Sequence, residues 1–157
     1  MRRSEREMHD QEAIKAVLDQ SHVGRMATIN REGYQVIKPL NYFYGDGKVY
    51  FHSSLKGEKM SDIRRGSPVC FEVDQPVAYV PARGQSCGAS YYYRSILIKG
   101  KARVVRSSKK KLEILERLME KYQPEGGYEG FAEEALRKTA VVEISVEEMT
   151  GKENLGS

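Results

Sequence analysis

The feature that most constrains the fold is a run of alternating apolar and polar residues over residues 91–105. Alternation with a period of two predicts a strand with one buried face. Gly100 interrupts the apolar set, and a glycine within a strand is typical of a bulge or sharp bend, as a barrel requires. The inward face is Ile96, Ile98, Gly100, Ala102 and Val104, and the outward face is Ser95, Leu97, Lys99, Lys101 and Arg103.

Shorter strands are expected at residues 25–29, 34–44, 48–52, 69–73 and 140–146, with 77–80 as a further candidate. Tight turns at residues 30–33 and 45–47 join the first three as hairpins. Pro39 cannot donate to a strand ladder, so it marks an edge or a bulge. Residues 81–88 form a long, glycine-containing loop, and loops of this length are usually functional or disordered.

Helices are expected at three breaks between strands. Asp10 can cap a helix that ends near Gln20, with Gly24 as a stop signal, and Ser107 or Ser108 can cap a second helix that ends near Tyr122. The apolar stripe of this second helix is Leu112, Leu115, Leu118 and Met119. A short helix over residues 131–137 precedes the last strand. Six or seven hairpin-linked strands predict a mainly β protein, an antiparallel Greek-key barrel decorated by helices.

Length and composition indicate one domain over residues 1–157, with residues 1–9 as a loose arm. No apolar run approaches the ~20 residues that a membrane span needs. Two cysteines and three scattered histidines form no metal pattern, so we expect a reduced, cytoplasmic protein without a metal site. The net charge is +4. Its basic residues are interleaved with acids, which argues against a nucleic-acid-binding barrel and is compatible with a small anionic ligand.

One stretch, residues 49–74, suggests where an anion would bind. A strand ends in Ser53 and Ser54, and Lys56 and Lys59 then open a short helical run. Backbone N–H groups at a helix start and the positive charge of lysine both favour an anion. The alternative is two solvated surface lysines on a connecting helix.

Five segments in sequence order resemble the FMN-binding split-barrel superfamily, and most closely the nitroimidazole-resistance branch of the pyridoxamine 5′-phosphate oxidase-related proteins. They are residues 36–42, 47–53, 57–59, 68–73 and 93–102. The resemblance covers roughly residues 10–152. It implies a split barrel that forms a homodimer, with an FMN in each of two grooves between the chains.

The resemblance also assigns residues to the cofactor. Ile37, Lys38, Pro39, Leu40 and Asn41 would run beside the isoalloxazine and the ribityl chain. The strand end Phe51, His52 and Ser53 would sit at the flavin and its phosphate tail. Lys59 and Lys56 would pair with the phosphate. Arg94 and Ser95 would reach the flavin from the partner subunit. His52 is the one candidate catalytic residue, and the alternative is a strand-end histidine that is hydrogen-bonded to a loop.

The implied activity is an FMN-dependent oxidoreductase that takes hydride from NAD(P)H and reduces a nitroaromatic or a quinone. No nicotinamide-nucleotide fold is visible, so donor and acceptor would use one groove in turn, which predicts ping-pong kinetics. The alternatives are a flavin- or haem-binding protein without turnover, or an F420-dependent split barrel. Ser95 stands where pyridoxamine phosphate oxidases have glutamine, and their C-terminal Arg-bearing motif is missing. We therefore do not expect pyridoxamine phosphate oxidase activity.

Overall fold

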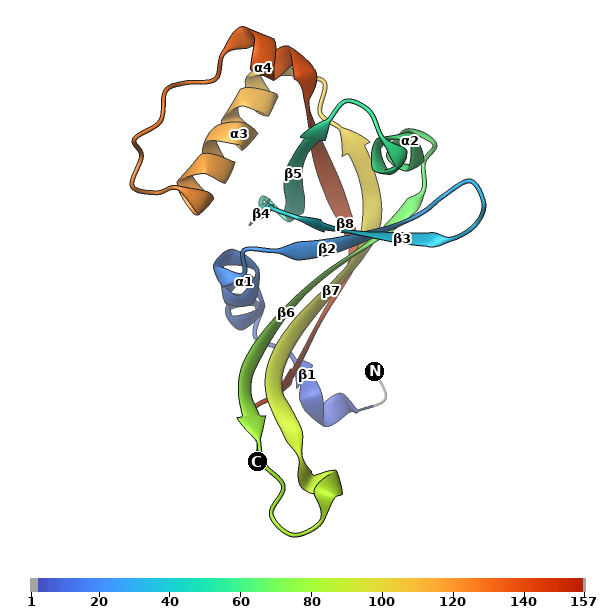
Figure 1. Cartoon of the computed structure of the whole chain (residues 1–157), viewed down its shortest axis with the longest axis vertical. Helices are drawn as coiled ribbons and strands as arrows, with labels where there is room; N and C mark the ends of the chain where they lie inside the picture. The colour runs from blue at the N-terminus through green and yellow to red at the C-terminus, as the bar shows by residue number, and fades with distance from the viewer. Residues whose placement is uncertain (1–2, 157) are drawn as a thin grey trace.

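The eight strands form one antiparallel sheet in the computed structural model, which describes residues 3–156 (Figure 1). The strands are β1 (Glu7–Met8), β2 (Gly24–Ile29), β3 (Gln35–Leu40), β4 (Phe43–Gly45), β5 (Lys48–Ser54), β6 (Pro68–Val80), β7 (Ser90–Val104) and β8 (Thr139–Asn154). The helices are α1 (Gln11–Gln20), α2 (Glu58–Arg64), α3 (Ser108–Tyr122) and α4 (Glu133–Lys138), with 3₁₀ turns at Ser4–Arg6 and Ser86–Gly88.

The strand order is β3-β2-β6-β7-β8-β5-β4, and β1 pairs with the free part of β8. This arrangement confirms the prediction of a mainly β, antiparallel split barrel with flanking helices. The two-residue β1 is the strand that the sequence did not predict. Figure 1 shows β6 and β7 continuing as a long ribbon below the barrel, while α2, α3 and α4 lie at the opposite end.

The central strands are longer than predicted. Residues 69–73 and 77–80 belong to one strand, β6, with a register shift between Pro76 and Ala78. The last strand continues beyond residue 146 to Asn154, and this added part pairs with β7. Its second half was missed because its apolar residues are few. Only Met149 and Gly151 lie opposite the core residues Ile98 and Ile96.

The bulge predicted at Gly100 is confirmed, since the β7–β8 register shifts between Lys99 and Gly100. A Cβ atom at this position would lie 2.0 Å from the carbonyl oxygen of Ser145. Gly24 was expected to stop the first helix, but it is a strand residue. The helix has already ended at Gln20, and a Cβ on Gly24 would lie 2.0 Å from the ring of Phe71.

The strand predicted over residues 34–44 is broken into β3 and β4 at Asn41 and Tyr42. Tyr42 leaves the ladder because its side chain turns fully into the core, where its hydroxyl donates to the carbonyl oxygen of Leu18 at 2.7 Å. Its backbone N–H donates instead to the Tyr122 hydroxyl at 2.8 Å. Pro39 lies on β3, the edge strand of the sheet, as predicted.

Two hydrophobic clusters hold the elements together. The larger fills the barrel and includes α1, whose predicted cap Asp10 accepts from the N–H of Glu12 at 2.9 Å. The smaller lies under α3 and is built from Phe43, Tyr50, Ile114, Leu115, Leu118 and Val141. The stripe predicted for α3 is therefore partly wrong. Leu112 is exposed, and Ile114 takes the buried position, because the helix begins after Ser107 and this sets its rotation.

The loose arm predicted over residues 1–9 is wrong for Glu7 and Met8, which pair with Lys152 and Gly151 of β8. Met8 is buried in the main core. Residues 1 and 2 lie outside the described part of the chain. No helix between residues 3 and 156 has the length and apolar character needed to cross a membrane.

Candidate functional site

The predicted anion site lies where β5 ends and α2 begins. Ser54 closes the turn by donating its hydroxyl to the carbonyl oxygen of Lys56 at 2.8 Å. Gly57 precedes the helix with φ of 111°, a conformation that favours glycine. The helix has seven residues and Glu58 in its first turn, so its dipole is too weak to hold an anion, and the charge must come from side chains.

A buried carboxylate fixes α2 on the barrel. Asp62 is 1% exposed and accepts from the hydroxyl of Thr28 on β2 at 2.9 Å. It also accepts from the guanidinium of Arg65 at 3.0 Å, and Arg65 in turn donates to the carbonyl oxygen of Ile29 at 2.7 Å. These contacts fix the rotation of α2 and so the direction of Lys59, which lies three positions before Asp62.

Lys59 carries a half-buried ammonium group that has no ion pair and no hydrogen bond within residues 3–156. Its Nζ lies 5.3 Å from the centre of the Phe51 ring. Burial, and then the positive charge of Lys38, lower the pKa of Lys59 below its usual value. A partly desolvated, uncompensated cation is stabilised by an anion.

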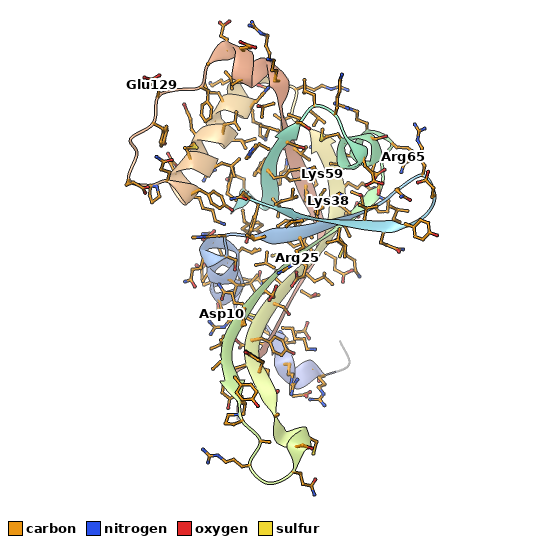
Figure 2. All side chains as sticks on the ribbon, in the orientation of Figure 1. Asp10, Arg25, Lys38, Lys59, Arg65 and Glu129 are labelled. Atoms are coloured by element: carbon orange, nitrogen blue, oxygen red, sulfur yellow. The ribbon has the colours of Figure 1, made fainter. Side chains whose placement is uncertain are left out.

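Lys38 reaches the same place from the edge strand β3. Its Nζ lies 3.7 Å from a carboxylate oxygen of Glu58. Figure 2 shows Lys38 and Lys59 next to each other between β3 and α2. One carboxylate thus faces two lysines, and the pair keeps a net positive charge.

His52 stands on β5 beside these lysines, on the exposed side of the strand. Burial by its neighbours, and then the charge of Lys59, lower the pKa of His52. The lowered pKa favours the neutral form of the imidazole. Its ring nitrogens make no hydrogen bond to any part of the described chain, so the alternative of a histidine tied to a loop is not what the structure has.

His52 also opens into a cavity of about 310 Å³ between the sheet and the helices α3 and α4. Two of the four polar side chains that line this cavity already make hydrogen bonds within the chain. The Tyr122 hydroxyl lies 2.7 and 2.9 Å from the carbonyl oxygens of His22 and Tyr42, and Thr139 donates to the carbonyl oxygen of Ala135 at 2.9 Å. Asn41 and His52 are left without partners among residues 3–156. The apolar wall is Leu115, Leu118, Met119, Phe131, Ala135 and Leu136.

The sequence-based site is thus partly assembled within one chain. Lys38, Asn41, His52 and Lys59 gather at one end of the barrel, and Ile37 and Pro39 are exposed on the neighbouring edge strand. Ser53 is half-buried beside His52, and Lys56 is fully exposed without a salt bridge in the described chain. The Leu40 and Phe51 side chains, expected to line the ring, are core residues at 8% and 0% exposure, so only their backbone can face a ligand.

Arg94 and Ser95 lie elsewhere. Both are on the lower half of β7, where Arg94 pairs with Glu153 at 3.1 Å and Ser95 is paired with Asp74 and Lys152. Lys59 sits near the other end of that strand, since α2 packs against β7. Within one chain these residues do not meet the lysine cluster.

The cavity wall on α3 and α4 was missed by sequence reasoning. The helix pattern was interpreted only as packing against the sheet. The sequence held no separate signal for it, because Leu115, Leu118, Met119 and Tyr122 have the ordinary i, i+3, i+4, i+7 spacing of a helix that packs on one surface.

Fold and site together define a split barrel with a cationic cluster beside an apolar cavity. The family described as pyridoxamine 5′-phosphate oxidase matches residues 10–153. The chain belongs to this family of flavin-binding split barrels.

Solved structures with the same fold come from several bacteria. A candidate 5-nitroimidazole antibiotic resistance protein from Bacteroides thetaiotaomicron is 24% identical with a TM-score of 0.81, covering 93% of this chain and 85% of that chain. A FAD and haem binding protein from Mycobacterium smegmatis is 19% identical with a TM-score of 0.87, covering 96% and 74%. The flavocytochrome Anf3 from Azotobacter vinelandii is 22% identical with a TM-score of 0.88, covering 99% and 72%. A search of curated protein sequences found no match.

Proposed function

We propose that the chain is an FMN-dependent oxidoreductase that reduces a small, neutral electrophile of the nitroaromatic or quinone type with NAD(P)H. The observation that carries this proposal is the Lys59 ammonium, which has no ion pair within residues 3–156 and lies near Lys38. The neighbouring His52, whose pKa is lowered by burial and by Lys59, lines an apolar cavity. Membership of the pyridoxamine 5′-phosphate oxidase family supports the flavin, and the likeness to a nitroimidazole resistance structure suggests the substrate class.

The residues fit a flavin phosphate. A phosphate monoester carries about −1.5 to −2 charges near neutral pH, and Lys59 and Lys38 supply two positive charges, with Glu58 offsetting part of one. Ile37 and Pro39 alternate with Lys38 on β3 and face its other side, so the backbone of residues 37–39 and of residues 51–53 is what can face the ring. Ser53 and Lys56 are proposed as additional phosphate contacts.

When bound, a flavin supplies reversible hydride transfer. His52 and Asn41 are the free polar groups at the cavity mouth and would orient an electrophile by hydrogen bonds. A neutral imidazole can donate a proton from one nitrogen while the other accepts a hydrogen bond. The apolar wall on α3 and α4 excludes water and selects a small, uncharged acceptor.

The cation cluster lies on the surface of a single chain, so we propose a homodimer in which Arg94 and Ser95 of the partner subunit complete the groove. The donor NAD(P)H and the acceptor would enter this shared groove in turn. Parallel-line steady-state kinetics are the expected signature.

Lys59→Ala tests the phosphate assignment. Loss of a charge-assisted hydrogen bond weakens binding by about 1.5–3 kcal/mol, so FMN affinity should fall about ten- to a hundredfold. Riboflavin has no phosphate and should bind the variant and the parent protein equally, as measured by flavin fluorescence quenching. Lys56→Ala should show a smaller loss in the same direction. Equal losses for FMN and riboflavin would mean that Lys59 supports the fold instead.

A second reading is a flavin- or haem-binding protein without turnover, or an F420-dependent protein. It is favoured by the likeness to a FAD and haem binding protein and to a flavocytochrome. The absorption spectrum of the purified protein and the mass of the ligand released by denaturation separate these cofactors. An FMN-loaded protein that NAD(P)H does not reduce under anaerobic stopped-flow conditions would favour this second reading.

A further inference from the structure

A second basic site lies at the opposite end of α2 from Lys59. A groove of about 680 Å³ runs between the end of α2 and the end of β7, which lie side by side in Figure 1. Three apolar residues and three arginines line it. The lining residues are Ile63, Arg64, Ala102, Arg103, Val104 and Arg106.

The positive charge of this groove is only partly offset by carboxylates. Arg103 pairs with Glu143, but Glu143 is shared with Lys48 at 3.3 Å and Lys110 at 3.4 Å. Arg64 and Arg106 make no ion pair or side-chain hydrogen bond with the described chain, and no carboxylate is among the lining residues. Two free guanidinium groups therefore face one groove, next to a third that shares its only carboxylate with two lysines.

The arginines of this groove favour a ligand that carries a phosphate. The guanidinium is always charged and presents a planar fork of donors that matches the oxygens of a phosphate. The size of the groove falls within the range of small-molecule sites, about 300–1,000 Å³. The apolar residues Ile63, Ala102 and Val104 can contact the organic part of such a molecule.

We propose that this groove binds the phosphate monoester of a small organic molecule, at a site separate from that of Lys59. Arg64 follows Lys59 by five positions, which places their side chains roughly 140° apart around the helix and about 7.5 Å apart along its axis. The two cation clusters therefore point in different directions from α2, and this second site does not depend on flavin binding.

The test is a calorimetric titration of the purified full chain with AMP, inorganic phosphate and adenosine. AMP should bind most tightly, phosphate more weakly and adenosine hardly at all. The double variant Arg64→Gln and Arg106→Gln keeps the length of both side chains and removes both charges. It should lose at least about tenfold in AMP affinity, because two charge-assisted contacts disappear. Arg83→Gln, an exposed loop arginine, is the matched control and should change nothing.

Lys59→Ala separates the two sites. AMP binding that survives in this variant and is lost in the arginine double variant supports the proposal. AMP binding that is lost in Lys59→Ala, or that is unchanged in the double variant, overturns it, as does adenosine binding as tightly as AMP. If the double variant melts at a lower temperature than the parent, each single variant is titrated instead, and each should lose part of the affinity.

Discussion

At the residue scale, the lowered pKa of Lys59 predicts how flavin binding depends on pH. The ligand-free protein holds this ammonium less readily than free lysine does, so Lys59 loses its proton below the ordinary value of 10.5. The charged form binds phosphate and the neutral form does not. FMN affinity should therefore be full near neutral pH and weaken as the pH rises through the lowered pKa.

Riboflavin is the control for this titration, because it carries the same ring and no phosphate. The ratio of FMN affinity to riboflavin affinity should fall at alkaline pH in the parent protein and stay flat in Lys59→Ala. A ratio that falls equally in both proteins would locate the titrating group outside Lys59. Fluorescence titrations at a series of pH values measure both ligands.

His52 should matter more for turnover than for binding. Replacing it by alanine removes one free polar group from the cavity mouth and leaves the lysine pair in place. Loss of one hydrogen bond of about 1.5 kcal/mol in the transition state lowers kcat by roughly tenfold. FMN affinity should change much less. His9→Ala is the control, because His9 is exposed; equal losses of kcat in both variants would contradict the assignment.

The residues of the site were predictable to different degrees. The residue pattern after β5 indicated an anion site at Lys59, and the family resemblance added Lys38, Asn41 and His52, which lie near it. Leu40 and Phe51 were placed at the ring because their neighbours in sequence were, yet alternate residues of a strand face opposite sides. One step along β5 separates the core from the ligand surface.

At the scale of elements, the anchor of α2 on β2 supports the site. Asp62→Ala removes the acceptor for a Thr28 hydroxyl that is 2% exposed. A buried donor left without a partner costs about 1–3 kcal/mol, so the free energy of unfolding should fall by this amount. FMN affinity should fall as well, because Lys59 is no longer held in place.

Thr28→Val provides the matched comparison for Asp62→Ala. The double variant should be less destabilised than the sum of the two single variants, with a coupling of about 1 kcal/mol, because both single changes remove the same hydrogen bond. Urea unfolding measures all four proteins. Additive effects would show that Asp62 acts mainly through Arg65.

The element boundaries predicted from the sequence are close to the observed ones where apolar and polar residues alternate strongly, as in β7. They are wrong where this alternation is weak. The second half of β8 has charged residues on its outer face and a glycine at a core position, so it showed no alternation. Its partner β7 supplies the missing pattern, and pairing of that kind is invisible in a single segment. The cavity was not predicted for the same reason, because α3, α4 and β5 are apart in the sequence and come together only in the folded chain.

At the scale of the whole molecule, the separation of Arg94 and Ser95 from Lys59 predicts a dimer. Leu97 lies two residues beyond Ser95 on the outer face of β7 and is 38% exposed. Leu97→Glu should produce a monomer in light scattering and weaken FMN binding at the same time. Val23→Glu, at a position that is 47% exposed away from β7, should leave both unchanged. A parent protein that is monomeric and still binds FMN tightly would refute the dimer.

The pairing of β1 with β8 has a consequence for how the chain matures. Met8 reaches its partner Gly151 only after the segment between them has left the ribosome, so the earlier strand must wait for the later one. The long-range pairing that closes the sheet at this seam makes folding slow compared with the formation of a local hairpin. Until β8 emerges, the side chain of Met8 lacks its strand partner Gly151, and exposed apolar surface of this kind is what a chaperone protects in a nascent chain.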